Sequence, residues 1–254
     1  MRHYPLLLAH ELRMLAVSAA TYCAAVLFLL LMGLIYFLVL YGYGHVENDP
    51  PMAQYFQIFF IPVFFVVPLL TMKSLADEQR HGTLEAMLTT PATTLEIVLA
   101  KYSAAYLFYI SLWAITLFFP YVAIWFLPGV GPDSPLRDTA SLAGGYLFVV
   151  ASGLLYIALG IFASSLTRNT LVAGMLCFSM LFVLIISGNL LPHLSLQESW
   201  FVHIQPAVDY LQTFRHLEDF SRGIVDTRPF FLYASNTILV LGVTTLVVES
   251  RTSA

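Results

Sequence analysis

Six long apolar runs constrain this chain more than any other feature of its sequence. An α-helix needs about 20 predominantly apolar residues to cross the hydrocarbon core of a bilayer, and each run is at least about that long. The composition agrees, since 59% of the residues are hydrophobic, 10% are charged and the mean hydropathy is +0.81. These values exclude a soluble domain. The sequence therefore predicts one all-α integral membrane domain over residues 1–254, with six transmembrane helices at about 15–41, 53–72, 95–127, 139–166, 171–191 and 230–248.

Two amphipathic segments accompany these spans. Residues 2–14 mix charged residues with leucines, which predicts a helix lying at the membrane surface before the first span. A cleaved signal peptide is the alternative, but the apolar run that follows is much longer than the roughly 7–15 residue core of such a signal. Between the fifth and sixth predicted spans, apolar residues recur at near-helical spacing from Pro206, which predicts a second amphipathic helix.

Prolines and small residues predict where the spans bend and pack. Pro62 and Pro68 lie in the second predicted span and Pro120 near the end of the third, and each removes a backbone donor, so we expect kinks there. Small residues in the fourth predicted span share a face and allow close helix packing, within the chain or with another subunit. They are Gly145, Ser152, Gly153, Gly160 and Ser164.

Basic residues indicate the orientation of the spans, because cytoplasmic loops carry an excess of Lys and Arg. Of the 11 basic residues, seven fall on the side that holds both termini and the loop 73–101. These are Arg2, Arg13, Lys73, Arg80, Lys101, Arg168 and Arg251. The other four are Arg137, Arg215, Arg222 and Arg228. The count predicts cytoplasmic termini, a cytoplasmic loop 73–101 and an external segment between the fifth and sixth spans.

The loop 73–101 is the only sizeable polar segment between two spans on the predicted cytoplasmic side. Gly82 interrupts any helix continuing out of the bilayer, and Thr83 can cap a short new helix. Apolar residues then share one face of this helix before a proline ends it, namely Leu84, Met87, Leu88 and Pro91. Thr93 and Glu96 fit a capping box, so the third span is predicted to begin there.

The order of residues in this loop resembles a known pattern. It reads Glu-x-x-x-Gly-Thr-Leu-Glu-x-x-Leu-x-x-Pro from Glu78 to Pro91, and it is similar to the coupling-helix region of permease subunits in the ABC type-two exporter family. The resemblance implies that this segment transmits conformational change between the membrane subunit and a separate ATPase subunit. On geometry alone, an ordinary interfacial loop helix is the alternative. The residues assigned to coupling in this way are Glu78, Arg80, Gly82, Thr83, Leu84, Glu85, Met87, Leu88 and Pro91.

The end of the chain carries a second resemblance. The run from Phe214 to Arg228, and Glu249-Ser-Arg251 after the last span, are similar to the end of type-two ABC permeases, especially the gliding-motility and nitrous-oxide-reductase-maturation types. The resemblance implies a homodimer of permease chains and two copies of an ABC ATPase subunit. It also implies a place in the bacterial inner membrane.

Catalytic and metal-binding motifs are missing from the sequence. The chain has two lysines, Lys73 and Lys101, and neither follows a glycine-rich turn, so there is no nucleotide-binding loop. His193, His203 and His216 are too widely spaced for a compact zinc site. With 11 basic residues and a net charge of -4, no basic patch for nucleic acid is present. We therefore expect a non-catalytic subunit without a cofactor or metal of its own, with ATP and Mg²⁺ on the partner.

These observations predict the membrane-spanning permease subunit of an ABC exporter. One alternative is a subunit that passes ATP-driven motion to a periplasmic or extracellular partner. Another is an ion-coupled secondary transporter, which is disfavoured because no ionisable residue is expected deep inside the spans. The apolar face of the external helix is predicted to pack against the outer ends of the spans and to act as an external gate. Its residues are Tyr210, Leu211, Phe214 and Leu217.

Overall fold

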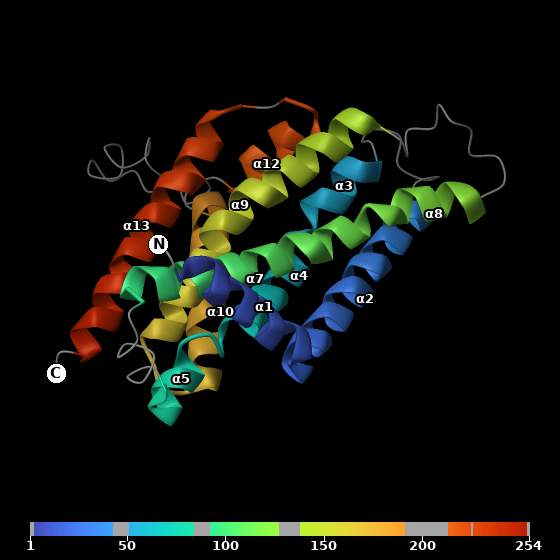
Figure 1. Cartoon of the computed structure of the whole chain (residues 1–254). Coiled ribbons are helices and arrows are strands. Elements are labelled where there is room, and N and C mark those ends of the chain that lie inside the picture. The colour runs from blue at the N-terminus through green and yellow to red at the C-terminus, as the bar shows by residue number, and fades with distance from the viewer. Residues whose placement is uncertain are drawn as a thin grey trace, which may run out of the picture.

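The computed structural model describes residues 3–42, 51–83, 92–126, 138–190, 213–224 and 226–252, and every regular element within these ranges is a helix (Figure 1). The elements, in chain order, are α1 (Tyr4–Val17), α2 (Ala19–Gly42), α3 (Pro51–Gln57), α4 (Phe60–Thr71), α5 (Ala76–His81), α7 (Thr94–Thr116), α8 (Phe118–Phe126), α9 (Thr139–Ser165), α10 (Thr170–Leu190), α12 (Thr213–Ser221) and α13 (Arg228–Thr252).

Five helical segments in the described ranges are long and apolar enough to cross a membrane. They are Ala19–Gly42, Phe60–His81, Thr94–Ala123, Thr139–Ser165 and Arg228–Arg251. The predicted fifth span corresponds to α10, whose side chains are described over Thr170–Ile186, a stretch shorter than these five. The all-helical membrane fold is thus confirmed, while the count of six spans stays a prediction.

Proline divides two of the predicted spans into separate helices. The second span is split into α3 and α4, with a break at residues 58–59. Pro62 explains the break, because it cannot donate the hydrogen bond that would reach the carbonyl of Ile58. The third span is likewise split at Leu117, three residues before Pro120. The predicted interruptions at Pro62 and Pro120 are therefore present.

The small residues of α9 let its neighbours approach closely. A Cβ atom added to Gly145 would lie 2.3 Å from the ring of Phe56 on α3, and one added to Gly153 would lie 2.5 Å from the ring of Tyr109 on α7. At Gly160 the side chain of Thr71 on α4 leaves equally little room. The prediction of close packing is confirmed, and these contacts lie within one chain. In Figure 1, α9 accordingly runs between α7 and α13.

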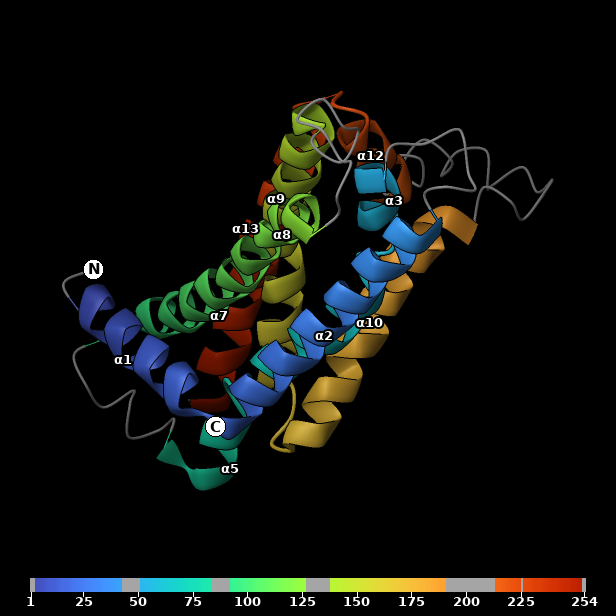
Figure 2. The same cartoon turned by 90° about the vertical axis from the view of Figure 1, so that its right-hand side faces the viewer.

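The two ends of the helical bundle carry different short elements. Figure 2 shows α3 and α12 together at the end where α9 begins, and α5 at the opposite end. On α12, Leu217 and Phe220 are completely buried, and the ring of Phe214 lies 5.1 Å from that of Phe60 on α4. The predicted packing of this helix on the chain's own spans is confirmed for Phe214 and Leu217, while Tyr210 and Leu211 lie outside the described residues.

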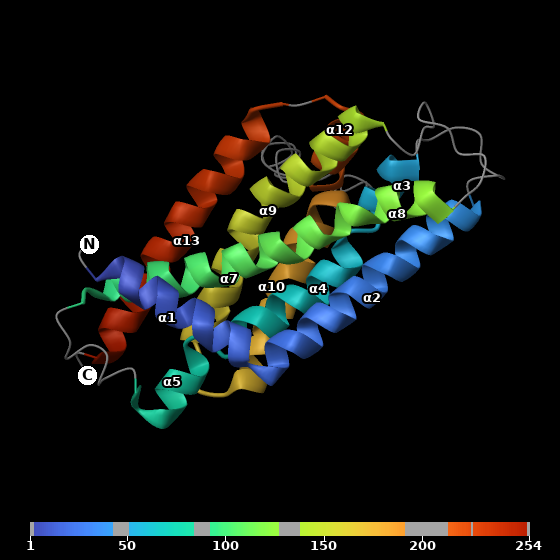
Figure 3. The ribbon, with the colours of Figure 1, turned by 45° about the vertical axis from the view of Figure 1, so that its right-hand side comes forward.

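The helices α1, α2, α4 and α10 complete the bundle. α4 packs between α2 and α10, and α1 lies along the beginning of α7 (Figure 3). The hydroxyl of Tyr4 on α1 donates a hydrogen bond of 2.8 Å to Ser103 Oγ on α7. No residue of α1 is buried, which agrees with the predicted surface helix.

Candidate coupling site

The short helix α5 ends at the glycine that the sequence singled out. Gly82 has φ 70° and ψ 8°, the left-handed conformation that terminates a helix, and its amide donates a hydrogen bond to the carbonyl of Glu78. The Thr83 hydroxyl lies 3.4 Å from the same carbonyl. The predicted interruption at Gly82 is confirmed. The coupling residues Leu84, Glu85, Met87, Leu88 and Pro91 lie outside the described residues.

Glu78 points back into the protein, where it meets a buried lysine. Lys101 Nζ lies 2.5 Å from Glu78 Oε1 and 2.7 Å from Glu11 Oε1. The Lys101 side chain is only 2% exposed, and those of Glu11 and Glu78 are 15% and 18% exposed. Three elements, α1, α5 and α7, therefore meet in one ion cluster. We call Glu11, Glu78 and Lys101 the α5 ion cluster.

The position of Lys101 corrects the sequence analysis. Lys101 was counted with the cytoplasmic loop 73–101 although it falls within the third span predicted at 95–127, and in the structure it lies about two turns inside α7, which begins at Thr94. The helix begins where the sequence predicts, because Thr93 and Glu96 form the expected capping box, with Glu96 N donating to Thr93 Oγ1 and Thr93 N donating to Glu96 Oε2. An ammonium group at this depth needs carboxylate partners, and the two glutamates supply them.

The start of α5 is held by a serine of α9. Ser164 Oγ accepts hydrogen bonds of 3.0 Å from the amides of both Leu75 and Ala76, and donates to the carbonyl of Met72. These amides begin a helix and have no partner inside it. The Ser164 side chain is fully buried, so the three bonds fix the chain where it leaves α4.

The other side of α5 is joined to α9 and α13 by Gln79. Its side-chain nitrogen donates to the carbonyl of Ser165 at 3.0 Å, and its side-chain oxygen accepts from Arg251 Nη1 at 2.9 Å. Arg251 Nη2 also donates to the carbonyl of Leu166 at 2.6 Å. One six-residue helix is thus in direct polar contact with α7, α9 and α13, and is connected to α1 through Lys101.

Most of these connections were missed by sequence reasoning. The sequence assigns Glu78 to contact with the ATPase subunit, and it indicates Ser164 only as a small packing residue. Glu11, Gln79 and Lys101 had been given no role in the site. The sequence did carry one signal, since Lys101 is an isolated charge in an apolar stretch.

We predict that Ser164→Ala lowers the free energy of unfolding by about 1–3 kcal/mol, because it leaves the amides of Leu75 and Ala76 buried without an acceptor. Thermal unfolding of the detergent-solubilised protein measures this change. Ser179→Ala is the matched control, because the exposed Ser179 hydroxyl bonds only to its own helix, at the carbonyl of Met175. Equal effects of the two substitutions would contradict the role given to Ser164.

The arrangement of the side chains in this region also bears on metal binding. Within the described ranges, no group of three or more His, Cys, Asp or Glu side chains is arranged to hold a metal ion. The two carboxylates of the α5 ion cluster share one ammonium group, so this site suits structural coupling between helices.

Comparison with known proteins supports the membrane fold. A comparison with curated proteins finds no match. The family model described as ABC-2 family transporter protein matches residues 7–249, which include every element from α2 to α12 and most of α1 and α13. The match covers the segment from Glu78 to Pro91 and the run from Phe214 to Arg228, which carried the sequence resemblance. This chain is therefore a multi-pass membrane protein that belongs to the ABC-2 transporter family.

Proposed function

We propose that this chain is the membrane-spanning permease subunit of an ABC exporter and that an ATPase subunit drives it through the segment from Gly82 to Pro91. Family membership implies an ABC ATPase as partner. The observation that carries the proposal is the position of α5, which directly precedes this segment and is connected to four other helices. A force applied just beyond Gly82 would therefore reach several spans at once.

The electrostatics of α5 suit such a role. Lys101 is attracted to both Glu11 and Glu78, and the low polarity around a 2% exposed side chain strengthens these attractions. Pulling α5 away would leave a buried ammonium group with only one of its two partners. We infer that α1, α5 and the beginning of α7 move together when the partner subunit closes on ATP.

The charge distribution supports placing this end in the cytoplasm. Residues at the α5 end include Arg80, Lys101, Arg168 and Arg251, of which Arg251 reaches the turn between α9 and α10 through the carbonyl of Leu166. The positive-inside rule assigns such an end to the cytoplasmic face. In the proposed assembly, two permease chains and two ATPase subunits work together in a bacterial inner membrane.

The end of the bundle that holds α3 and α12, which is external in the proposed orientation, favours a second candidate function. α12 is packed against α3 and α9, with Leu217 and Phe220 completely buried. This helix could close an external gate, or it could carry motion to a periplasmic or extracellular partner. Transport of a labelled substrate in vesicles distinguishes export from mechanical work. Ion coupling is less favoured, because the α5 ion cluster is paired and lies near the end of its spans.

Reconstitution with the ATPase subunit tests the proposal. The permease alone should hydrolyse no ATP, and ATP hydrolysis in vesicles should require both subunits. Leu84→Asp together with Leu88→Asp should abolish binding of the ATPase subunit, because the change removes apolar contact and adds unpaired charge. Thr89→Asp with Thr90→Asp is the control, since it adds the same charge and removes no apolar side chain. Unchanged binding and ATP hydrolysis in the leucine variant would refute the coupling role.

A further inference from the structure

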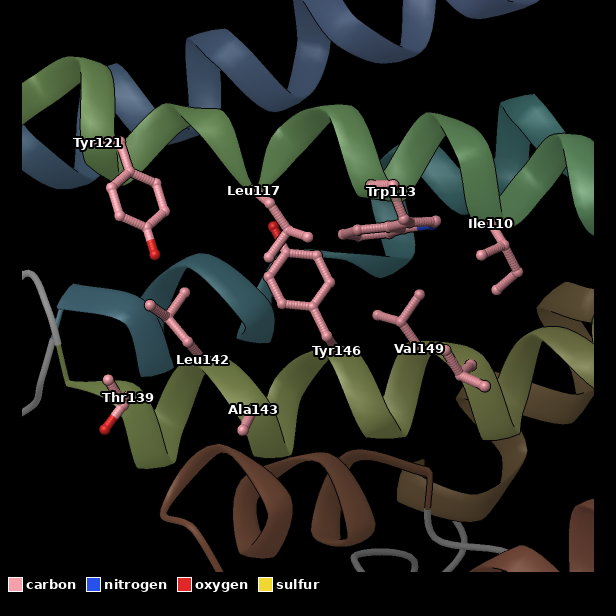
Figure 4. Close-up of a pocket in the computed structure, with 11 residues that line it drawn as sticks. Ile110, Trp113, Leu117, Tyr121, Thr139, Leu142, Ala143, Tyr146 and Val149 are labelled. Atoms are coloured by element: carbon pink, nitrogen blue, oxygen red, sulfur yellow. The ribbon is translucent and has the colours of Figure 1, made fainter.

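An open apolar groove runs between α7–α8 and α9, away from the α5 end (Figure 4). Its volume is about 380 Å³, within the range of about 300–1,000 Å³ that ligand pockets occupy. Trp113 and Val149 form its buried floor, while Leu117, Tyr121 and Val150 line it and are 40%, 60% and 39% exposed. The groove therefore opens on the outer surface of the two spans.

Tyrosine hydroxyls join α7 to α9 on the α5 side of the groove and again within it. Toward the α5 end, Tyr102 OH donates to the carbonyl of Leu154 at 3.2 Å, and Tyr106 OH donates to the carbonyl of Val150 at 2.9 Å. Farther along, Tyr146 reaches from α9 to Thr116 on α7 with an oxygen separation of 2.8 Å. Figure 4 shows Tyr146 spanning the gap between the two helices.

The dimensions of the groove limit what it can hold. The lining on α9 runs from Thr139 to Val150, about 16 Å at 1.5 Å per residue. Dividing the volume of about 380 Å³ by this length gives a mean cross-section of about 24 Å². An α-helix about 10 Å across needs about 80 Å², so a whole helix does not enter the groove, although a helix of another subunit would cover it from outside. A single extended hydrocarbon chain is of the right shape.

Depth and polarity agree with this occupant. One leaflet contributes about 15 Å of hydrocarbon, close to the length of the groove. No charged side chain lines it, and its polar groups include the hydroxyls of Thr139 and Tyr121 near the end where α9 begins. Asp138, the N-cap of α9, and the 82% exposed Trp125 mark the level of the membrane interface at that end.

We propose that this groove binds one acyl chain of a phospholipid from the leaflet that borders the beginning of α9. The acyl chain lies along Leu117, Leu142 and Val149, and the ester region of the lipid lies at Tyr121 and Thr139. The bound chain fills space that α7 and α9 leave between them, so the lipid is retained where other boundary lipids exchange. This site is independent of the ATPase partner and does not rest on the proposed function.

Photolabelling in lipid nanodiscs tests the proposal. The protein is placed among phospholipids that carry a diazirine in one acyl chain, and labelled residues are mapped by mass spectrometry. Labelling of Leu117 and Leu142 is expected to exceed that of Leu147 several-fold, because Leu147 is 36% exposed on α9 but does not line the groove. Equal labelling of the three leucines would overturn the proposal.

Substitutions that fill the groove give the second measurement. Ala143→Trp and Ala114→Phe enter it from opposite walls, and each is expected to lower labelling of Leu117 and Leu142 to the level at Leu147. Leu147→Trp is the control and should leave labelling of Leu117 and Leu142 unchanged. Labelling that persists in both filled variants would refute the site, as would a disulfide between two copies of an Ala143→Cys chain.

Discussion

Replacing Lys101 with methionine is expected to lower the free energy of unfolding by about 3–5 kcal/mol, because Glu11 and Glu78 would be left close together without their shared cation. Both carboxylates are largely buried, and among the described residues Glu78 Oε2 already has no hydrogen-bond partner. Thermal unfolding in detergent measures the loss. We also expect stimulation of the ATPase subunit to fall, since α5 would no longer be joined to α1 and α7.

The matched control removes all three charges at once. Lys101→Met combined with Glu11→Gln and Glu78→Gln leaves no unpaired ion, so most of the lost stability should return. If ATPase stimulation stays low while stability returns, the ion cluster itself carries the coupling. If the Lys101→Met protein unfolded at the same temperature as the unaltered protein, the structural role of the α5 ion cluster would be contradicted.

Gly144→Ala is expected to displace α12 and to lower the free energy of unfolding by about 3 kcal/mol or more, the upper end of what overpacking costs. A Cβ atom at this position would lie 1.9 Å from the backbone carbonyl oxygen of Phe220. A backbone atom within a helix cannot rotate away as a side chain can. The result would be seen as a lower unfolding temperature and as faster proteolysis of the segment around α12.

The control for this substitution is Gly242→Ala on α13. Nothing lies within 4 Å of a Cβ atom added at Gly242, and alanine is favoured over glycine in a helix by about 1 kcal/mol. This change should therefore be neutral or stabilising. Similar stability of the two variants would show that α12 is not seated against Gly144.

The sequence predicted the features that depend on local patterns. The limits of α9, the break at Gly82 and the capping box of Thr93 and Glu96 follow from residues within a few positions of one another. The division of the second span after Gln57 also has a local cause in Pro62. The family resemblance is confirmed for the ABC-2 family as a whole, and its finer types stay predictions.

The polar contacts of α5 could not be predicted in the same way. The cluster joins residues that are far apart in sequence, namely Glu11, Glu78 and Lys101. They meet only because α1 lies along α7 and because α5 brings Glu78 to Lys101 on α7. A single buried cation in an apolar span signals that partners exist, but packing decides which acids supply them. The groove has the same origin, since it depends on how far α7 and α9 diverge.

The proline breaks described above determine which helices are stiff. Among the helices in polar contact with α5, α7 is interrupted at Leu117, whereas α9 and α13 run unbroken from one end of the bundle to the other. An unbroken helix resists bending and axial compression, while a helix with a missing hydrogen bond yields at the gap. In the proposed mechanism, we therefore expect a displacement of α5 to be transmitted along α9 and α13 and to move α12, which packs on α9.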